Sequence, residues 1–317
     1  MSHNFRGVKR VSLLLLAFCG AYVLHLAYAA STRKAPKPPK PAAPPLYTAQ
    51  KLCDLKDPQI DESSGMGASR LYPGLLWTHN DSGDTARLFL IDQAGDTRAV
   101  VTLNGAIARD WEDMAVAGSG NNAWVYVGDI GDNNAEHNGI TIYRFREPQL
   151  NISAAAAPQT LAVDCEQMTL HYPDGARDAE SLLATTDGQL FLVSKSLGGS
   201  AVYSTPGPFT DGASQTLQLV GSIAINSDSF FGRLTTGGDI SPDGTRIVVR
   251  TYTEAYEWLK PKNTSWQALW KTRPRSWELP TSQQGEAICY GLDSNSLFLT
   301  SEKLPTPLWK LTARPRK

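Results

Sequence analysis

Five times along this chain of 317 residues, an acidic residue opens a short apolar segment that leads into two further β-rich segments. The acids recur at intervals of roughly 47–68 residues. A repeat of this length, built from short strands, is typical of a β-propeller blade. Equivalent residues of successive blades face one axis, so the pattern predicts that the acids converge in a ring. They are Glu62, Glu112, Glu180, Asp239 and Glu286.

The repeat count predicts an all-β fold with a single five-bladed propeller; a sixth blade hidden in the long second repeat is the alternative. Fourth strands are expected at Ala99–Leu103, Leu161–His171 and Leu217–Ile225, with a weak one near Trp277. The last repeat ends after its third strand. We therefore expect the strand-like segment Leu46–Leu55 to close the ring on the last blade and hide its edge.

Three regions follow from composition. Residues 1–30 carry basic residues before the apolar run Val11–Ala29, which fits either a cleaved signal peptide or an uncleaved membrane anchor. Residues 31–45 form a Pro/Ala/Lys-rich linker, and residues 46–317 form the propeller. We expect an extracytoplasmic protein, periplasmic or secreted, or one anchored to the membrane by its N-terminal segment.

The net charge limits the expected binding partners, and the positions of the cysteines argue against disulfides. The net charge of −1 gives no field that favours nucleic acid. Cys289 is expected on an innermost strand, Cys53 on an outermost one and Cys165 in another blade, so all three should be free. We expect a monomer that binds a small-molecule or envelope ligand in the central channel or on the propeller face.

The paired acids suggest a metal site. Residues two apart on a strand share a face, so both carboxylates of each pair point the same way. Converging carboxylates need a cation, and calcium accepts six to eight oxygen ligands. The alternative is that each acid is structural and bonds to backbone amides or nearby basic residues. The pairs are Asp110-Trp111-Glu112 and Asp178-Ala179-Glu180.

A second motif, Asp-x-Gly-Asp, begins at Asp81 and again at Asp129, about 48 residues later. Such turns can bind calcium or satisfy their own amides through Asx-turns. Other repeats place Lys195, Arg250 with Tyr252, and Glu302 at the corresponding positions. This arrangement predicts either a polar pocket for an anionic or ester-like ligand, or ion pairs across the channel. The candidate metal ligands are Glu62, Asp110, Glu112, Asp129, Asp178, Glu180, Asp239 and Glu286, and the candidate catalytic residues are Glu112, Glu180, Lys195 and Arg250.

An insertion in the fourth repeat carries four tryptophans among basic residues. It fits either a ligand-binding loop or a loop folded onto its own blade. The tryptophans are Trp258, Trp266, Trp270 and Trp277.

The segment Gly238–Val249 resembles the Ser-Pro-Asp-Gly hairpin of TolB-type propellers. More broadly, the segments that begin at Glu62, Arg109, Gly128 and Gly285 resemble uncharacterised exported bacterial propellers, akin to the esterase-like phytase and gluconolactonase superfamilies. The resemblance implies a channel metal bound by acids from several blades. The clustered basic residues of phytases have no match here. We expect an exported calcium-binding propeller that acts as a metal-dependent hydrolase of an ester, lactone or phosphoester; the alternative is a non-enzymatic ligand- or protein-binding module of the cell envelope.

Overall fold

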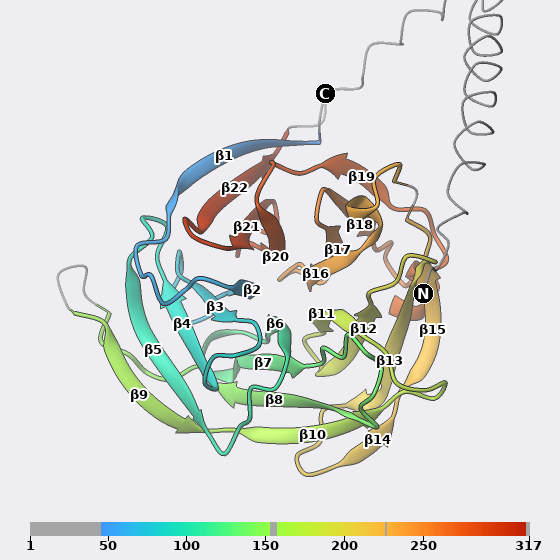
Figure 1. Ribbon diagram of the computed structural model, residues 1–317, viewed down its shortest axis with the longest axis horizontal. Coiled ribbons are helices and arrows are strands. Elements are labelled where there is room, and N and C mark those ends of the chain that lie inside the picture. The colour runs from blue at the N-terminus through green and yellow to red at the C-terminus, as the bar shows by residue number, and fades with distance from the viewer. Residues whose placement is uncertain (1–45, 153–156, 226, 315–317) are drawn as a thin grey trace, which may run out of the picture. The chain divides into compact units, whose positions relative to one another are not determined.

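The computed structural model describes residues 46–152, 157–225 and 227–314. Five sheets, built mainly from antiparallel strand pairs, surround a central axis (Figure 1). This confirms the five-bladed propeller rather than six blades. The predicted signal peptide or anchor and most of the linker lie outside the described residues. Within the described ranges, no helix is long and apolar enough to cross a bilayer.

The blades follow one another along the chain, and each has its first strand nearest the axis (Figure 1). Blade 1 contains β2 (Ser63–Ala68), β3 (Leu76–Asn80), β4 (Arg87–Ile91) and β5 (Thr97–Asn104). Blade 2 contains β6 (Trp111–Ala117), β7 (Trp124–Asp129), β8 (Ile140–Arg146) and β10 (Glu166–His171). Blade 3 contains β11 (Ala179–Ala184), β12 (Gln189–Ser194), β13 (Ser200–Pro208) and β15 (Gln218–Ile223). Blade 4 contains β16 (Thr235–Ile240), β17 (Arg246–Thr251), β18 (Glu254–Leu259) and β19 (Arg275–Glu278). Blade 5 contains β20 (Gln284–Tyr290), β21 (Ser296–Glu302) and β22 (Pro307–Ala313).

Three blades carry an outer strand from elsewhere in the chain. β1 (Tyr47–Asp54) pairs antiparallel with β22 and is the fourth strand of blade 5. β9 (Gln159–Asp164) pairs in parallel with β5 of blade 1, and β14 (Ser214–Thr216) pairs in parallel with β10 of blade 2. The single fourth strand predicted over Leu161–His171 is therefore wrong: the chain changes sheets at Cys165, between β9 and β10.

Apolar side chains fill the spaces between neighbouring blades. Burying large aromatic groups there is the main stabilising contribution. Trp77 of blade 1 packs edge-on against Phe145 of blade 2, with 6.0 Å between their ring centroids. The tight layering of the blades fixes where the first residues of each inner strand lie relative to one another.

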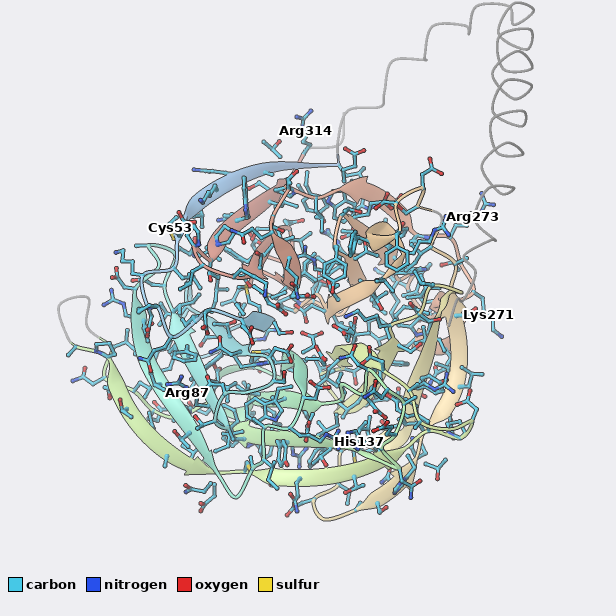
Figure 2. All side chains as sticks on the ribbon, viewed as in Figure 1. Cys53, Arg87, His137, Lys271, Arg273 and Arg314 are labelled. Atoms are coloured by element: carbon cyan, nitrogen blue, oxygen red, sulfur yellow. The ribbon has the colours of Figure 1, made fainter. Side chains whose placement is uncertain are left out.

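The Trp-rich insertion is folded onto its own blade and its neighbour. It contains the short helix α2 (Trp266–Leu269). Trp258, Trp270 and Trp277 are buried, and Trp270 contacts Phe191 of blade 3 with 6.0 Å between ring centroids. The basic residues Lys271 and Arg273 of the insertion lie at the periphery of the ring (Figure 2). Of the two alternatives, the folded-back loop is the one observed.

A buried carboxylate joins β1 to blades 4 and 5. Glu257 on β18 is fully buried and accepts hydrogen bonds from the hydroxyls of Tyr47 on β1 (2.9 Å) and Tyr290 on β20 (2.8 Å). Arg275 on β19 forms an ion pair with the same carboxylate. A buried charge is tolerated only when it is paired and hydrogen-bonded, as Glu257 is.

The three cysteines of the propeller are free, as predicted. Cys289 is buried on the innermost strand of blade 5, whereas Cys53 lies on β1 at the outer edge of the ring (Figure 2). Cys165 lies at the junction of β9 and β10. Cys53 and Cys165 are only partly buried, whereas Cys289 is fully buried.

Candidate functional site: an acidic mouth of the central channel

The innermost strands share a bulge at one position. In four blades the residue before the bulge pairs with the last residue of the second strand, as Trp111 pairs with Asp129 and Ala179 with Ser194. In all five blades the register then shifts. Bulges re-aim a side chain and are common beside functional sites. The residues at the shift are Ser64, Glu112, Glu180, Thr236 and Glu286.

The predicted equivalence of the five acids is therefore wrong for two of them. Ser64 and Thr236 occupy the position assigned to Glu62 and Asp239. Glu62 lies two residues earlier and forms a bridge with Glu302 at the rim. Both residues were misaligned because sequence spacing shows that an acid is near a strand start but does not show the strand register.

Asp239 lies deeper in the propeller and is a structural acceptor. Its carboxylate accepts hydrogen bonds from the amides of Ile240 (2.8 Å) and Tyr290 (2.8 Å). Burial raises its pKa to about 7, against the opposing effect of Arg70. Ile240 and Arg70 line a separate cavity of about 380 Å³ beside the turns between the first and second strands. The structure does not bring Asp239 together with the other candidate ligands.

A second ring of side chains comes from residues at the end of the second strand of each blade or directly after it. The residue after the paired strand end is Asp81 in blade 1, Lys195 in blade 3, Tyr252 in blade 4 and Glu302 in blade 5. We call these two rings, together with Asp110 and Asp178 next to Glu112 and Glu180, the acidic mouth. Ile130 occupies the same place in blade 2, so Asp129 and Arg250 do not belong to this ring.

Two groups of carboxylates in the acidic mouth have the spacing of a metal site. Within each group, one carboxylate oxygen per residue lies within 4.8 Å of the others. Glu112 belongs to both groups, so it joins acids from three successive blades. The groups are Asp81, Asp110 and Glu112, and Glu112, Asp178 and Glu180.

These residues fit a calcium ion. All donors are carboxylate oxygens, which hard cations prefer, and zinc or copper would favour nitrogen or sulfur. The backbone is shaped around them: a Cβ added to Gly131 would lie 2.4 Å from both Asp110 Oδ2 and Glu112 Oε1. The amide of Asp132 also donates to Asp178 Oδ1 at 3.0 Å, which positions that carboxylate.

The carboxylates are difficult to ionise together in the absence of a cation. Burial, and then the charges of Glu180 and Asp81, raise the pKa of Glu112 well above its ordinary value. Burial and then nearby acids raise the pKa of Asp81 to about 6. Lys195 donates to Glu180 at 2.5 Å and neutralises part of the charge. A cation would remove the remaining repulsion.

Glu286 lies beyond these two groups, on blade 5. Burial raises its pKa to about 7, opposed by Lys195 and Arg250. Its Oε2 atom is buried without a hydrogen-bond partner among the described residues. Tyr252 interacts with both Glu286 and Lys195. Glu302 completes this side of the mouth, and burial, followed by Glu286 and Asp81, raises its pKa to about 8.

Arg250 and Asp129, both predicted site residues, have structural contacts. Arg250 is 1% exposed and donates to the carbonyl oxygens of Thr251, Ala287 and Thr300. Asp129 accepts from the amide of Asp110 at 2.9 Å. Arg250 thus supports the strand that carries Glu286, and Asp129 positions a candidate ligand.

The Asp-x-Gly-Asp motifs serve mainly to organise their own turns. Asp132 accepts from the amides of Glu136 and His137, both at 2.9 Å. Asp84 forms an ion pair with Arg87 at 2.9 Å. Of the four motif acids, Asp81 belongs to one of the two carboxylate clusters, although it is not among the metal ligands predicted from the sequence.

Comparison with known proteins gives similarity at the level of solved structures. No family model matches the chain, and no curated protein matches it. Among solved structures, a gluconolactonase from Xanthomonas campestris is 14% identical, with a TM-score of 0.44 over 89% of this chain and 99% of that one. A streptogramin B lyase is 12% identical, with a TM-score of 0.44 over 84% of this chain and 98% of that one. A luciferin-regenerating enzyme is 10% identical, with a TM-score of 0.45 over 84% and 95%. These likenesses assign no activity to this chain, and the function is argued from the acidic mouth itself.

Proposed function

We propose that this protein is a calcium-binding β-propeller that hydrolyses an ester, lactone or phosphoester in the acidic mouth. The main supporting observation is that Glu112 belongs to both clusters of acidic residues, which together draw on three blades. Lys195 is already ion-paired with Glu180, so the remaining negative charge is available to a cation. Asp81, Asp110, Glu112, Asp178 and Glu180 are the ligands of this proposal.

Bound calcium would supply a Lewis acid that polarises the substrate's oxygen. The chain's own residues supply the proton transfer. Glu286 takes the role of general base, because a pKa of about 7 suits proton transfer near neutral pH. Glu112 and Glu180, two of the catalytic residues predicted from the sequence, serve as metal ligands in this proposal. Lys195 and Tyr252 lie between the ligands and Glu286 and orient the substrate.

The proposal extends to location and partners. The basic and apolar pattern of residues 1–30 supports export, with the segment cleaved or retained as an anchor. The ligand is a small molecule or envelope component in the channel. We propose a monomer without affinity for nucleic acid, as the net charge of −1 supports.

Calorimetric titration with calcium tests the metal site. The wild type should give a saturable binding heat and melt at a higher temperature with calcium, because the ion binds the folded state alone. The Glu112→Gln/Glu180→Gln variant should fold but lose this response. Glu278→Gln on outer strand β19 is the matched control and should retain it. Absence of a calcium heat in the wild type, with melting unchanged by a chelator, would overturn the metal site.

A panel of simple esters, lactones and phosphoesters tests the enzyme. With calcium, the wild type should hydrolyse at least one class, and Glu286→Gln should lower kcat by about 10²–10⁴-fold while calcium still binds. Calcium binding with no hydrolysis across the panel would favour the non-enzymatic binding module in place of the hydrolase.

A further inference from the structure

Exposed apolar side chains gather around the acidic mouth. Four loops carry them: those that lead into β6 and β16 and those that follow β12 and β21. These loops lie at the sheet ends where the acidic mouth is formed. Exposed apolar residues concentrated on one face mark a binding surface more often than scattered ones do. The residues are Ile107, Leu197, Phe230, Phe231 and Leu304.

Two of them continue an aromatic path that begins inside the mouth. Tyr252 interacts with Glu286, and the Lys195 ammonium lies 5.5 Å from the centroid of its ring. The ring of Phe231 meets Tyr252 edge-on at 5.8 Å, and Phe230 meets Phe231 edge-on at 5.4 Å. Tyr252 is half-buried among the charges, whereas Phe230 and Phe231 are 57% and 60% exposed, so the path leads from the mouth to solvent.

The loop that presents the phenylalanines is held in place. Phe231 begins the short 3₁₀ helix η2 (Phe231–Arg233), and the Arg233 side chain donates to the Ser227 carbonyl at 2.8 Å. A Cβ added to Gly232 would lie 2.1 Å from Ser227 Oγ and 2.9 Å from Thr253 Oγ1. The loop therefore packs directly on the turn that contains Tyr252, and this pre-organises the exposed rings.

We propose that Tyr252, Phe231 and Phe230 form an aromatic platform that binds the apolar group of an amphiphilic substrate, an aryl or alkyl ester or phosphoester, whose polar end lies in the acidic mouth. This inference rests on the proposed function and names its substrate class. The platform is continuous with the mouth, so one molecule would contact both. Burying the exposed phenyl surface against an apolar group favours binding, and aromatic geometry adds selectivity for an aryl group.

A matched pair of non-hydrolysable phosphonates tests the platform. Phenylphosphonate and methylphosphonate share the polar group and differ in the apolar one. In saturating calcium, calorimetry on the wild type should show about tenfold tighter binding of phenylphosphonate. In Phe230→Ser/Phe231→Ser, which leaves only Tyr252 of the platform, most of this preference should be lost while the calcium titration is retained. Leu219→Ser removes a comparably exposed apolar side chain (56%) from outer strand β15, and it should retain the preference.

Each other outcome overturns the platform in a recognisable way. If calcium binds but the wild type shows no preference, or binds neither phosphonate, the platform is wrong and the metal site stands. A preference that survives undiminished in the double variant places the aryl group elsewhere. If phosphatidylcholine vesicles sediment the wild type but not the double variant, and no aryl preference exists, the rings face lipid instead. Absence of calcium binding is the separate failure of the proposed function.

Discussion

At the scale of single residues, Gly131 determines how closely the chain after β7 approaches two carboxylates. Its Cα faces Asp110 and Glu112, and any side chain would occupy the space that their oxygens now share. Gly131 has no left-handed backbone angle, so its requirement is steric. The absence of a side chain at Gly131 therefore allows Asp110 and Glu112 to take the positions proposed for them as metal ligands.

Gly131→Ala should therefore weaken calcium binding by about tenfold or more, since ligand geometry must be kept within a few tenths of an ångström. Because only the mouth is disturbed, the variant should still fold. Gly207→Ala is the matched control, because nothing lies within 4 Å of its added Cβ. Calorimetric titration of both variants measures the effect; equal calcium affinities would contradict the steric role of Gly131.

The raised pKa values predict an unusual pH dependence of stability. The pKa of Glu302 is about 8 in the folded protein and near 4.5 when unfolded. The folded state thus binds more protons between these values, so metal-free stability should fall as pH rises from about 4.5 to 8. Glu302→Gln removes this contribution and should raise the melting temperature at pH 8 by several degrees, with little effect at pH 4.5.

Calcium should act in the opposite direction, because it binds ionised carboxylates. Its stabilising effect should increase as pH rises through the pKa of Asp81, at about 6. Differential scanning calorimetry across pH, with calcium or with chelator, measures both trends. A metal-free melting temperature that rises steadily to pH 8 would show that the acids are not repelling one another.

At the scale of elements, each boundary between blades has its own connecting element. β9 joins repeat 2 to blade 1, and β14 joins repeat 3 to blade 2. The Trp-rich insertion packs blade 4 against blade 3. Glu257 and Tyr47 connect blade 4 to β1, and β1 continues from blade 5 into blade 1. These connections explain how a ring of separate sheets holds the mouth residues in register.

Trp270→Ala should destabilise the protein by about 3–5 kcal/mol, because it leaves a cavity at the boundary of blades 3 and 4. Trp270 is 4% exposed and contacts both Phe191 and Trp258. Trp266→Ala, in the same insertion but only partly buried, should cost clearly less. Urea unfolding of the two variants measures the difference; similar losses would show that the insertion does not join the blades.

The sequence predicted the strands of the propeller well, since alternating β-rich runs and turn residues are local signals. It did not predict register, and this is why Glu62 and Asp239 were grouped with Glu112. Nor did it predict β9 and β14, because their parallel partners lie far away in the chain. Phe230 and Phe231 carried a signal, an adjacent aromatic pair in a polar loop, but no strand pattern connects them to Tyr252.

At the scale of the whole molecule, the connected boundaries predict one cooperative unfolding unit for the propeller. Each blade shares its apolar core with its neighbours, so losing one blade exposes the faces of two others. Calorimetry should show a single endotherm that calcium shifts as a whole. Two resolved endotherms, of which calcium moves only one, would contradict this.

The position of β1 also means that it is synthesised long before its partner strand. Its partner β22 is translated after the other strands of the propeller, roughly 250 residues later, which corresponds to tens of seconds at typical rates of synthesis. Throughout that interval β1 has no partner strand, a state that invites pairing with other chains. Its central residues Gln50 and Lys51 are polar and exposed even in the finished ring, and a lysine on an unpaired strand discourages such pairing. The composition of β1 therefore suits it to remain unpaired in solvent until β22 has been synthesised.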